Sequence, residues 1–195
     1  MKLYYSPGAC SLAGHIVAVE GGLPLELEKV DLKTHKTEKG EDFYAINPKG
    51  YVPTLKLDDG SILAENAALL PFLGGKTGAM PQEGMDYFHA LEWIGFVSSE
   101  LHKSFSPLFH GAPDEVKAKA KEKILGRLKL VEDRLTGDYL MGSAFTPPDA
   151  YLYVILRWAK AMHIDVSHLP RVAAFKVRME GREGVQKALK EEGLH

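Results

Sequence analysis

The 195-residue sequence predicts two domains, an α/β unit over residues 1–76 and an all-helical unit over residues 84–195. Three observations support this prediction. Apolar runs and turn signals in the first unit follow the order strand, helix, strand, helix, strand, strand, helix. Glycine and proline then concentrate between residues 74 and 84, which is typical of a linker. After the linker, apolar residues recur every three or four positions, as they do along buried helix faces.

Turn residues divide the first unit into short elements. The helix that starts near Ser11 is expected to end at Gly21-Gly22, and its flanking strands require a crossover connection. Two short apolar runs around Asp58-Asp59-Gly60 are typical of a hairpin. Pro71 is expected to shorten or kink the last helix. The other expected elements are a strand at 25–32, a loop at 34–40, a short helix at 41–46, hairpin strands at 54–57 and 61–63, and a helix at 65–73.

Long apolar stripes predict the helices of the second unit. The stripe over 87–108 forms one helix face, and Gly95, Ser99 and His102 form a small or polar line beside it. A helix that begins at Thr146-Pro147-Pro148-Asp149 is expected to have a capping box in which the aspartate reaches back. The remaining expected helices lie at 113–135, 172–179 and 185–189.

Composition is that of an ordinary globular protein, with 45% hydrophobic and 26% charged residues. The net charge of -2 does not indicate a nucleic-acid or anionic-membrane partner. We expect no signal peptide and no membrane span, and the single cysteine fits a reducing cytoplasm. The eight histidines are scattered without the close pairing of a metal site, so we expect no metal.

Cys10 is the only cysteine and lies where the first strand turns into the first helix. At that place a thiol faces unpaired backbone N–H groups and the positive end of the helix dipole. This environment favours the thiolate and predicts a lowered pKa. The alternative is a buried, inert thiol, because free cysteine is among the most buried residue types.

Two further motifs are suited to holding a ligand. Val52-Pro53 opens a strand beside the Cys10 turn and leaves backbone free to pair with a ligand, although sequence alone favours a trans bond. Glu65 and Asn66 begin a helix, where Asn66 is a good N-cap. Together they also suit the two ends of an α-amino acid, since helix-start N–H groups bind a carboxylate and Glu65 binds an ammonium.

His102, with Glu100 and Lys103 nearby, is the third candidate cluster. A lone histidine on a helix is more often a bystander than a catalyst, but the line of small residues beside it leaves room for a ligand. His15 and His89 are expected to be surface residues.

Taken together, these motifs resemble the bacterial beta class of cytosolic glutathione transferases over almost the whole length. The residues that show the resemblance are Tyr4 to Ser11 with Cys10, Asn47-Pro48-Lys49-Gly50 before Val52-Pro53, Glu65, Ser99-Glu100-Leu101-His102-Lys103 before Phe105-Ser106-Pro107-Leu108-Phe109, and Asp149-Ala150-Tyr151-Leu152 before Leu156-Arg157-Trp158. The resemblance implies a thioredoxin-like first domain, an all-helical second domain and a homodimer.

The resemblance also implies how glutathione binds. Pro53 would be cis, the Val52 backbone would pair with the cysteinyl part, and Glu65 with Asn66 would hold the γ-glutamyl end. Cys10 and His102 would lie beside the glutathione sulfur as catalytic residues. The candidate binding set is completed by His35, near the glycyl carboxylate, and by Ser99 and Glu100. The chain differs from the family pattern at His35, Tyr51, Asn66 and Gly95.

Three functions stay open at this point. The first is transfer of glutathione, the co-substrate, to a small electrophile. The second is glutathione-dependent reduction of disulfides or peroxides through Cys10, because the sequence lacks a Cys-x-x-Cys pair but permits a one-thiol cycle. The third is glutathione binding with little turnover.

Overall fold

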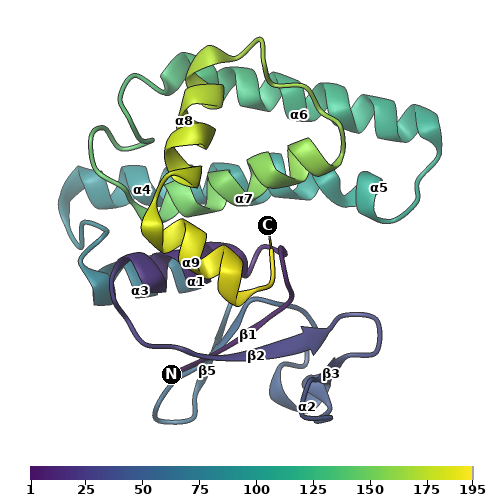
Figure 1. Ribbon diagram of the computed structural model, residues 1–195, viewed down its shortest axis with the longest axis vertical. Coiled ribbons are helices and arrows are strands. Elements are labelled where there is room, and N and C mark those ends of the chain that lie inside the picture. Colours follow the sequence, from purple (N-terminus) through teal and green to yellow (C-terminus); the bar gives the residue numbers. More distant parts are fainter. Residues whose placement is uncertain (195) are drawn as a thin grey trace.

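The computed structural model describes residues 1–194, in which a mixed sheet with its helices is followed by a bundle of helices (Figure 1). The expected order of strands and helices is confirmed, with a short third strand added. The elements are β1 (Lys2–Tyr5), α1 (Leu12–Glu20), β2 (Glu26–Asp31), β3 (Lys36–Thr37), α2 (Phe43–Ile46), β4 (Thr54–Lys56), β5 (Ile62–Ala64), α3 (Asn66–Thr77), α4 (Gly84–Phe96), the π-helical turn η1 (Val97–Leu101), the 3-10 turn η2 (His102–Phe105), α5 (Ser106–Phe109), α6 (Asp114–Arg134), α7 (Pro147–Ala161), α8 (Pro170–Glu180) and α9 (Glu183–Glu191).

The sheet has the strand order β3-β2-β1-β4-β5. β1 is parallel to β2, as the crossover through α1 requires, and antiparallel to β4. β4 and β5 are antiparallel, which confirms the hairpin around Asp58-Asp59-Gly60. β3 lies inside the expected loop at 34–40, where Thr37 pairs with Val30. Two residues are too few to show a strand period, so only the pairing with β2 reveals this strand.

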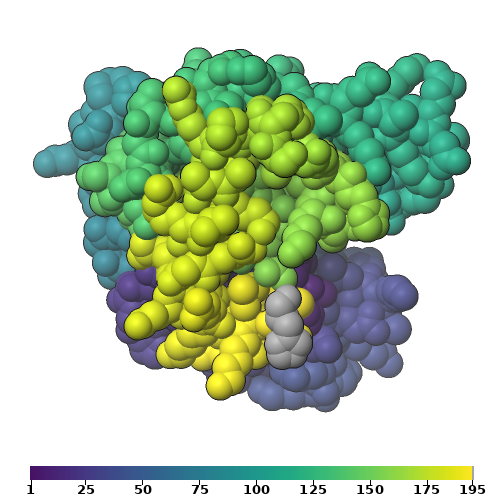
Figure 2. Space-filling view, turned by 45° about the horizontal axis from the view of Figure 1, so that its top comes forward, coloured from purple at the N-terminus to yellow at the C-terminus, as the bar shows by residue number. Residues whose placement is uncertain are grey.

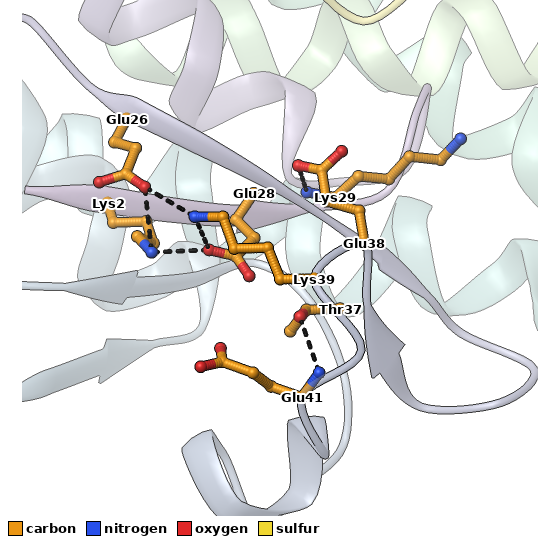
Figure 3. A network of polar contacts seen from close by, with 8 residues as sticks. All are labelled: Lys2, Glu26, Glu28, Lys29, Thr37, Glu38, Lys39 and Glu41. Carbon is orange, nitrogen blue, oxygen red and sulfur yellow. Dashed lines mark hydrogen bonds and ion pairs between the residues drawn. The ribbon is translucent and has the colours of Figure 1, made fainter.

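An ion-pair network connects β2 to its neighbours (Figure 3). The buried carboxylate of Glu28 accepts a hydrogen bond from Nζ of Lys2 on β1 at 2.6 Å and from Nζ of Lys39 at 3.1 Å. Burial opposes the charge of Glu28, but the two ammonium groups outweigh burial and lower its pKa. The network therefore joins β1, β2 and the segment after β3.

Helices α1 and α3 lie between the sheet and the helical bundle (Figure 1). α1 packs against α3, α7 and α9, and its side chains Leu12, Ile16 and Val17 are fully buried. One core cluster extends from β1 and β4 through α1 and α3 into α4, α6 and α7. The two parts of the chain thus share a continuous core, which holds residues from both parts in fixed relative positions.

Helix α3 continues through Pro71 to Thr77, so the prediction that it ends near residue 73 is wrong. A proline inside a helix costs about 3 kcal/mol through its missing N–H and its ring. Leu69, Leu70 and Leu73 are fully buried in the core, and their burial offsets that cost. Gly74 belongs to this packing, since a Cβ there would lie 2.7 Å from Met80 and Pro147. It is a close-contact residue of the helix rather than part of a flexible linker.

The capping box at the start of α7 is confirmed. The buried carboxylate of Asp149 accepts hydrogen bonds from the backbone N–H of Thr146 at 2.8 Å and from its hydroxyl at 2.7 Å. It also accepts from the N–H of Leu140 at 2.8 Å, which joins the preceding loop to the helix. Burial raises the pKa of Asp149 to about 6, although these donors act in the opposite direction.

None of the helices within residues 1–194 combines the length and the hydropathy that crossing a bilayer requires.

Candidate active site

A pocket of about 260 Å³ lies where the two parts of the chain meet. Residues on both sides of the α3–α4 connection line it, so neither part forms it alone. Six residues of the candidate set line this pocket, namely Cys10, Val52, Pro53, Glu65, Asn66 and His102. Four further lining residues are Tyr51, Ser98, Lys103 and Tyr151. Lys103 belongs to the candidate cluster around His102, whereas the other three are not among the candidate site residues.

Cys10 precedes α1, as expected, and its thiol donates a hydrogen bond to the carbonyl oxygen of Val52 at 3.3 Å. Burial raises the pKa of this thiol to about 12. The backbone N–H groups of Cys10 and Ser11 do favour the thiolate, but desolvation outweighs them, and the charge of Glu65 adds to the rise. The prediction of a lowered thiol pKa is therefore wrong for the free protein, in which Cys10 is a neutral donor.

The peptide bond between Val52 and Pro53 is cis, in agreement with what the resemblance implied. Pro53 immediately precedes β4, whose first residue Thr54 is buried against the sheet. Asn47 supports this turn, because its side-chain amide donates to the carbonyl oxygen of Tyr51 at 3.0 Å and to the hydroxyl of Thr54 at 2.8 Å. The hydrogen bonds of Asn47 thus stabilise the turn that places the Val52 backbone at the pocket.

Glu65 precedes α3 in a left-handed conformation, with φ of 74°. Its carboxylate accepts a hydrogen bond from Nζ of Lys49 at 2.7 Å and from the hydroxyl of Tyr51 at 2.5 Å. The ion pair with Lys49 is the largest cause of the lowered pKa of Glu65. Glu65 is therefore an anion at neutral pH, and the turn before Val52 supplies both of these partners.

Asn66 is the first residue of α3 and not its N-cap, so the capping prediction is wrong. Its side-chain Nδ2 donates to the carbonyl oxygen of Cys10 at 3.0 Å, which ties the start of α3 to the start of α1. Among residues 1–194, no donor reaches its buried Oδ1. Asn66 therefore positions the Cys10 backbone.

His102 and Tyr151 form a polar pair in the pocket, with His102 Nδ1 at 2.6 Å from the Tyr151 hydroxyl. Burial, and secondly the charge of Lys103, lowers the pKa of His102 to about 4. Burial also raises the pKa of Tyr151 above its usual range. At neutral pH both groups are therefore uncharged. The ring of Trp158 packs edge-on against His102, with centroids 4.9 Å apart.

The helix expected to run through 87–108 changes its winding at η1, where the hydrogen bonds are π-helical. Ser98 and Ser99 both lie in this π turn, and Ser98, not Ser99, lines the pocket. Ser99 instead donates to the carbonyl oxygen of Gly95 at 2.9 Å, and Glu100 pairs with Nε of Arg127 at 2.8 Å. The structure does not bring these two binding candidates into the pocket.

His35 also lies outside the pocket lining. Its Nδ1–H donates to the carbonyl oxygen of Gly50 at 2.8 Å, and its ring lies over Tyr44 with centroids 4.5 Å apart. It therefore supports the turn that carries Tyr51 and Val52. His89 is exposed, as expected.

His15 is buried, so the prediction of a surface position is wrong. Its two ring nitrogens meet the carboxylates of Glu191 and Glu192, which are 176 and 177 residues away in the chain. In the sequence, the only sign of this contact is the pair of adjacent glutamates, Glu191 and Glu192. The pair does not indicate that His15 is their partner.

The comparison with known families decides the identity of the chain. The family model for the N-terminal domain of glutathione S-transferases matches residues 8–75, and the model for their C-terminal domain matches residues 89–183. Glutathione S-transferase GstA of Escherichia coli O157:H7 is 40% identical over 200 residues that cover 100% of both chains. The chain belongs to the glutathione S-transferase family.

Solved glutathione S-transferases have nearly the same fold. A sphingomonad glutathione S-transferase in complex with glutathione is 42% identical, with a TM-score of 0.95 over 100% of both chains. A beta-class glutathione S-transferase of Sphingomonas chungbukensis is 40% identical, also with a TM-score of 0.95 over 100% of both chains. The thioredoxin-like first domain, the helical second domain and the beta-class resemblance are thereby confirmed.

Within residues 1–194, no group of three or more histidine, cysteine, aspartate or glutamate side chains is arranged to hold a metal ion. The polar groups that line the pocket include the Glu65 anion and the uncharged side chains of Cys10, His102 and Tyr151, together with Tyr51, Asn66, Ser98 and Lys103.

Proposed function

We propose that this glutathione S-transferase binds reduced glutathione in the pocket beside Cys10 and conjugates it to small electrophiles. One observation supports this most directly. A single pocket combines the Glu65 carboxylate, the backbone next to the cis bond of Pro53, and the side chains of Cys10 and His102. These groups suit the ammonium, the peptide and the sulfur of glutathione respectively.

The γ-glutamyl ammonium of glutathione would share the Glu65 carboxylate with Lys49 and Tyr51. The cysteinyl N–H of glutathione would donate to the carbonyl oxygen of Val52, which now accepts from the Cys10 thiol. Release from that bond would turn the Cys10 S–H toward the glutathione sulfur. A neutral Cys10 donates to a thiolate, whereas a second thiolate would repel it.

His102 is proposed as the second donor to the glutathione thiolate. Tyr151 is protonated and His102 is neutral at pH 7. We assign the tyrosine O–H as the donor to Nδ1, which places the ring proton of His102 on Nε2. Donors that are fixed before the reaction stabilise an anion without reorganisation. Together they would increase the fraction of glutathione present as the nucleophilic thiolate.

Glutathione-dependent reduction of disulfides is the second candidate function, because the pocket presents one thiol where a mixed disulfide with glutathione could form. Purified protein should be assayed with glutathione and an aryl halide, a disulfide or a hydroperoxide. Turnover of the aryl halide supports conjugation, and turnover limited to the disulfide or hydroperoxide supports the redox alternative. Glutathione binding without any turnover would leave only a binding role.

The enzyme is proposed to act in the cytoplasm as a homodimer. Two large apolar side chains on α4 face solvent, Met85 with 64% and Phe88 with 58% of its surface exposed, and Leu130 on α6 is also exposed. Met85 and Phe88 are three positions apart on α4 and so lie on one face of that helix. An exposed apolar helix face is typical of a contact surface. Light scattering at micromolar concentration should give about twice the 21.5 kDa chain mass, and Phe88→Glu should lower it. A monomer mass for the wild type would contradict the dimer.

A further inference from the structure

The loop that carries Cys10 is held by two residues from the far end of the chain. Gly8, in this loop, has a φ of 70°. Its N–H donates to Oε2 of Glu192 at 2.9 Å, across 184 residues. Its carbonyl oxygen accepts from Nε1–H of Trp158 at 2.8 Å, across 150 residues. Local hydrogen bonds between Ser6, Ala9 and Ser11 hold the rest of the loop, whereas both polar groups of Gly8 bind residues distant in the chain.

The carboxylate of Glu192 is fully buried and is held on its other side by His15. Nδ1 of His15 lies 3.0 Å from Oε1 of Glu192, and its Nε2 lies 2.8 Å from the partly exposed Glu191. A buried carboxylate is costly unless every oxygen has a partner. Because Gly8 and His15 provide these partners, the position of Glu192 and the position of the loop depend on each other.

Helix α9 is attached to α1 at both of its ends (Figure 1). At its start, Nε of Arg182 donates to Glu20, the last residue of α1, at 3.0 Å. At its end, Glu192 binds Gly8 before α1 begins. Figure 2 shows the yellow C-terminal helices extending from the helical bundle onto the N-terminal part of the chain. Glu192 is therefore held in position by a helix that binds α1 at its start and the Gly8 loop at its end.

We propose that Glu192 is a positioning residue, which holds the Gly8 peptide and thereby sets the place of the Cys10 thiol in the pocket. Trp158 links the same peptide to the other catalytic candidate, since its ring packs on His102. The catalytic part of this inference rests on the proposed function. The structural part concerns Cys10 and its loop in the free protein and does not depend on glutathione.

The structural part is tested by alkylation of Cys10 with iodoacetamide at pH 8, followed by intact mass spectrometry. Cys10 is the single cysteine, so the added mass reports on this loop alone. Glu192→Leu removes the acceptor of Gly8 at similar volume and should raise the alkylation rate about tenfold or more, as loss of a hydrogen bond to a charged group predicts. Glu192→Gln keeps an acceptor for Gly8 and should restore a rate near that of the wild type.

Glu191→Gln is the matched control, because Glu191 contacts His15 but not Gly8. It should change the rate by less than about threefold, as expected for a partly exposed polar contact. Equal alkylation rates for wild type and Glu192→Leu, both folded by circular dichroism, would overturn the proposal. So would an equal rise in Glu192→Leu and Glu192→Gln.

Should Glu192→Leu fail to fold, amide hydrogen exchange on the wild-type protein provides the test. The Gly8 N–H should exchange at least about tenfold more slowly than in an unstructured peptide, because it is bonded to a buried carboxylate. Exchange at the unstructured rate would overturn the proposal.

The catalytic part is tested by kcat and by the glutathione Kd in the Glu192→Leu variant. kcat should fall about tenfold or more, whereas Kd should change by less than about threefold, because Glu65 and the Val52 backbone are untouched. A loss confined to Kd would contradict a positioning role. If the wild type has no transferase activity, the proposed function fails, while the alkylation and exchange results still decide whether Glu192 holds the loop.

Discussion

The thiol of Cys10 lies 3.3 Å from the carbonyl oxygen of Val52, so the single cysteine and the backbone beside the cis proline share one hydrogen bond. This contact joins two features that are separate in the sequence. A ligand that displaces Cys10 from the Val52 carbonyl frees the thiol hydrogen for another acceptor. The protonation state of Cys10 is therefore central to the proposed chemistry.

Cys10 should react slowly with iodoacetamide at neutral pH and faster at each higher pH through pH 9. The pKa of the thiol is about 12, so the reactive thiolate fraction still increases tenfold per pH unit in this range. The rate should be measured by intact mass spectrometry, with free glutathione as the reference thiol. A plateau of the Cys10 rate below pH 8 would show that the thiol pKa is not raised.

Cys10→Ala should separate the two candidate activities. Conjugation to an aryl halide should be largely retained, because His102 and backbone N–H groups still stabilise the glutathione thiolate. Disulfide reduction should fall to background, because no mixed disulfide can form at position 10. Both assays should be run with wild type and variant, together with mass spectrometry for a glutathione adduct. Full retention of disulfide reduction without a wild-type adduct would make Cys10 a structural residue.

His102 should make the protein less stable as the pH falls from about 6.5 to about 4. The unfolded chain binds a proton on this histidine below its ordinary pKa, whereas the folded chain does not. Stability from the neutral ring is therefore fully present above pH 6.5 and lost as the pH falls through the folded pKa, by at most about 1.4 kcal/mol per pH unit. Urea unfolding of His102→Gln should show a smaller loss than wild type. The exposed His89→Gln should follow the wild type, and identical curves for all three would refute the shift.

Glu65→Gln should weaken glutathione binding by about 1.5–3 kcal/mol, or roughly tenfold or more in Kd, because it removes the anionic partner of the ammonium. The side chain keeps its length, so packing at the start of α3 is preserved. Calorimetry with glutathione measures the effect. Glu26→Gln, an exposed glutamate on β2 outside the pocket lining, is the matched control and should bind as the wild type does. Unchanged affinity in Glu65→Gln would remove Glu65 from the site.

Asp149→Ala should destabilise the fold by about 3 kcal/mol or more, because two backbone N–H groups and one hydroxyl lose a buried acceptor at about 1–3 kcal/mol each. Asp149→Asn keeps one acceptor oxygen but turns an amide toward another donor, so an intermediate loss is expected. Denaturant unfolding measures both variants. A loss below about 1 kcal/mol in the alanine variant, as expected for an exposed cap, would show that the box is not a core contact.

Much of the fold could be predicted because it depends on neighbouring residues. The Asp58-Asp59-Gly60 hairpin, the capping box of Thr146 and Asp149, and the place of Cys10 before a helix involve residues a few positions apart. Pro71 and Gly74 were misjudged, because their local preferences for a break are outweighed by the burial of α3 between other elements.

The sequence by itself determined which chemical groups are present and in what order, and it placed Cys10, Glu65 and His102 at the starts or faces of helices. Only the tertiary structure decided their environment. Desolvation of Cys10 reversed the shift expected from the helix dipole, Ser98 and not Ser99 lines the pocket, and Glu192 contacts His15 and Gly8. The physical reason is that burial and hydrogen bonding depend on atoms that are distant in the chain, and at these positions they are stronger than the local preferences that sequence patterns record.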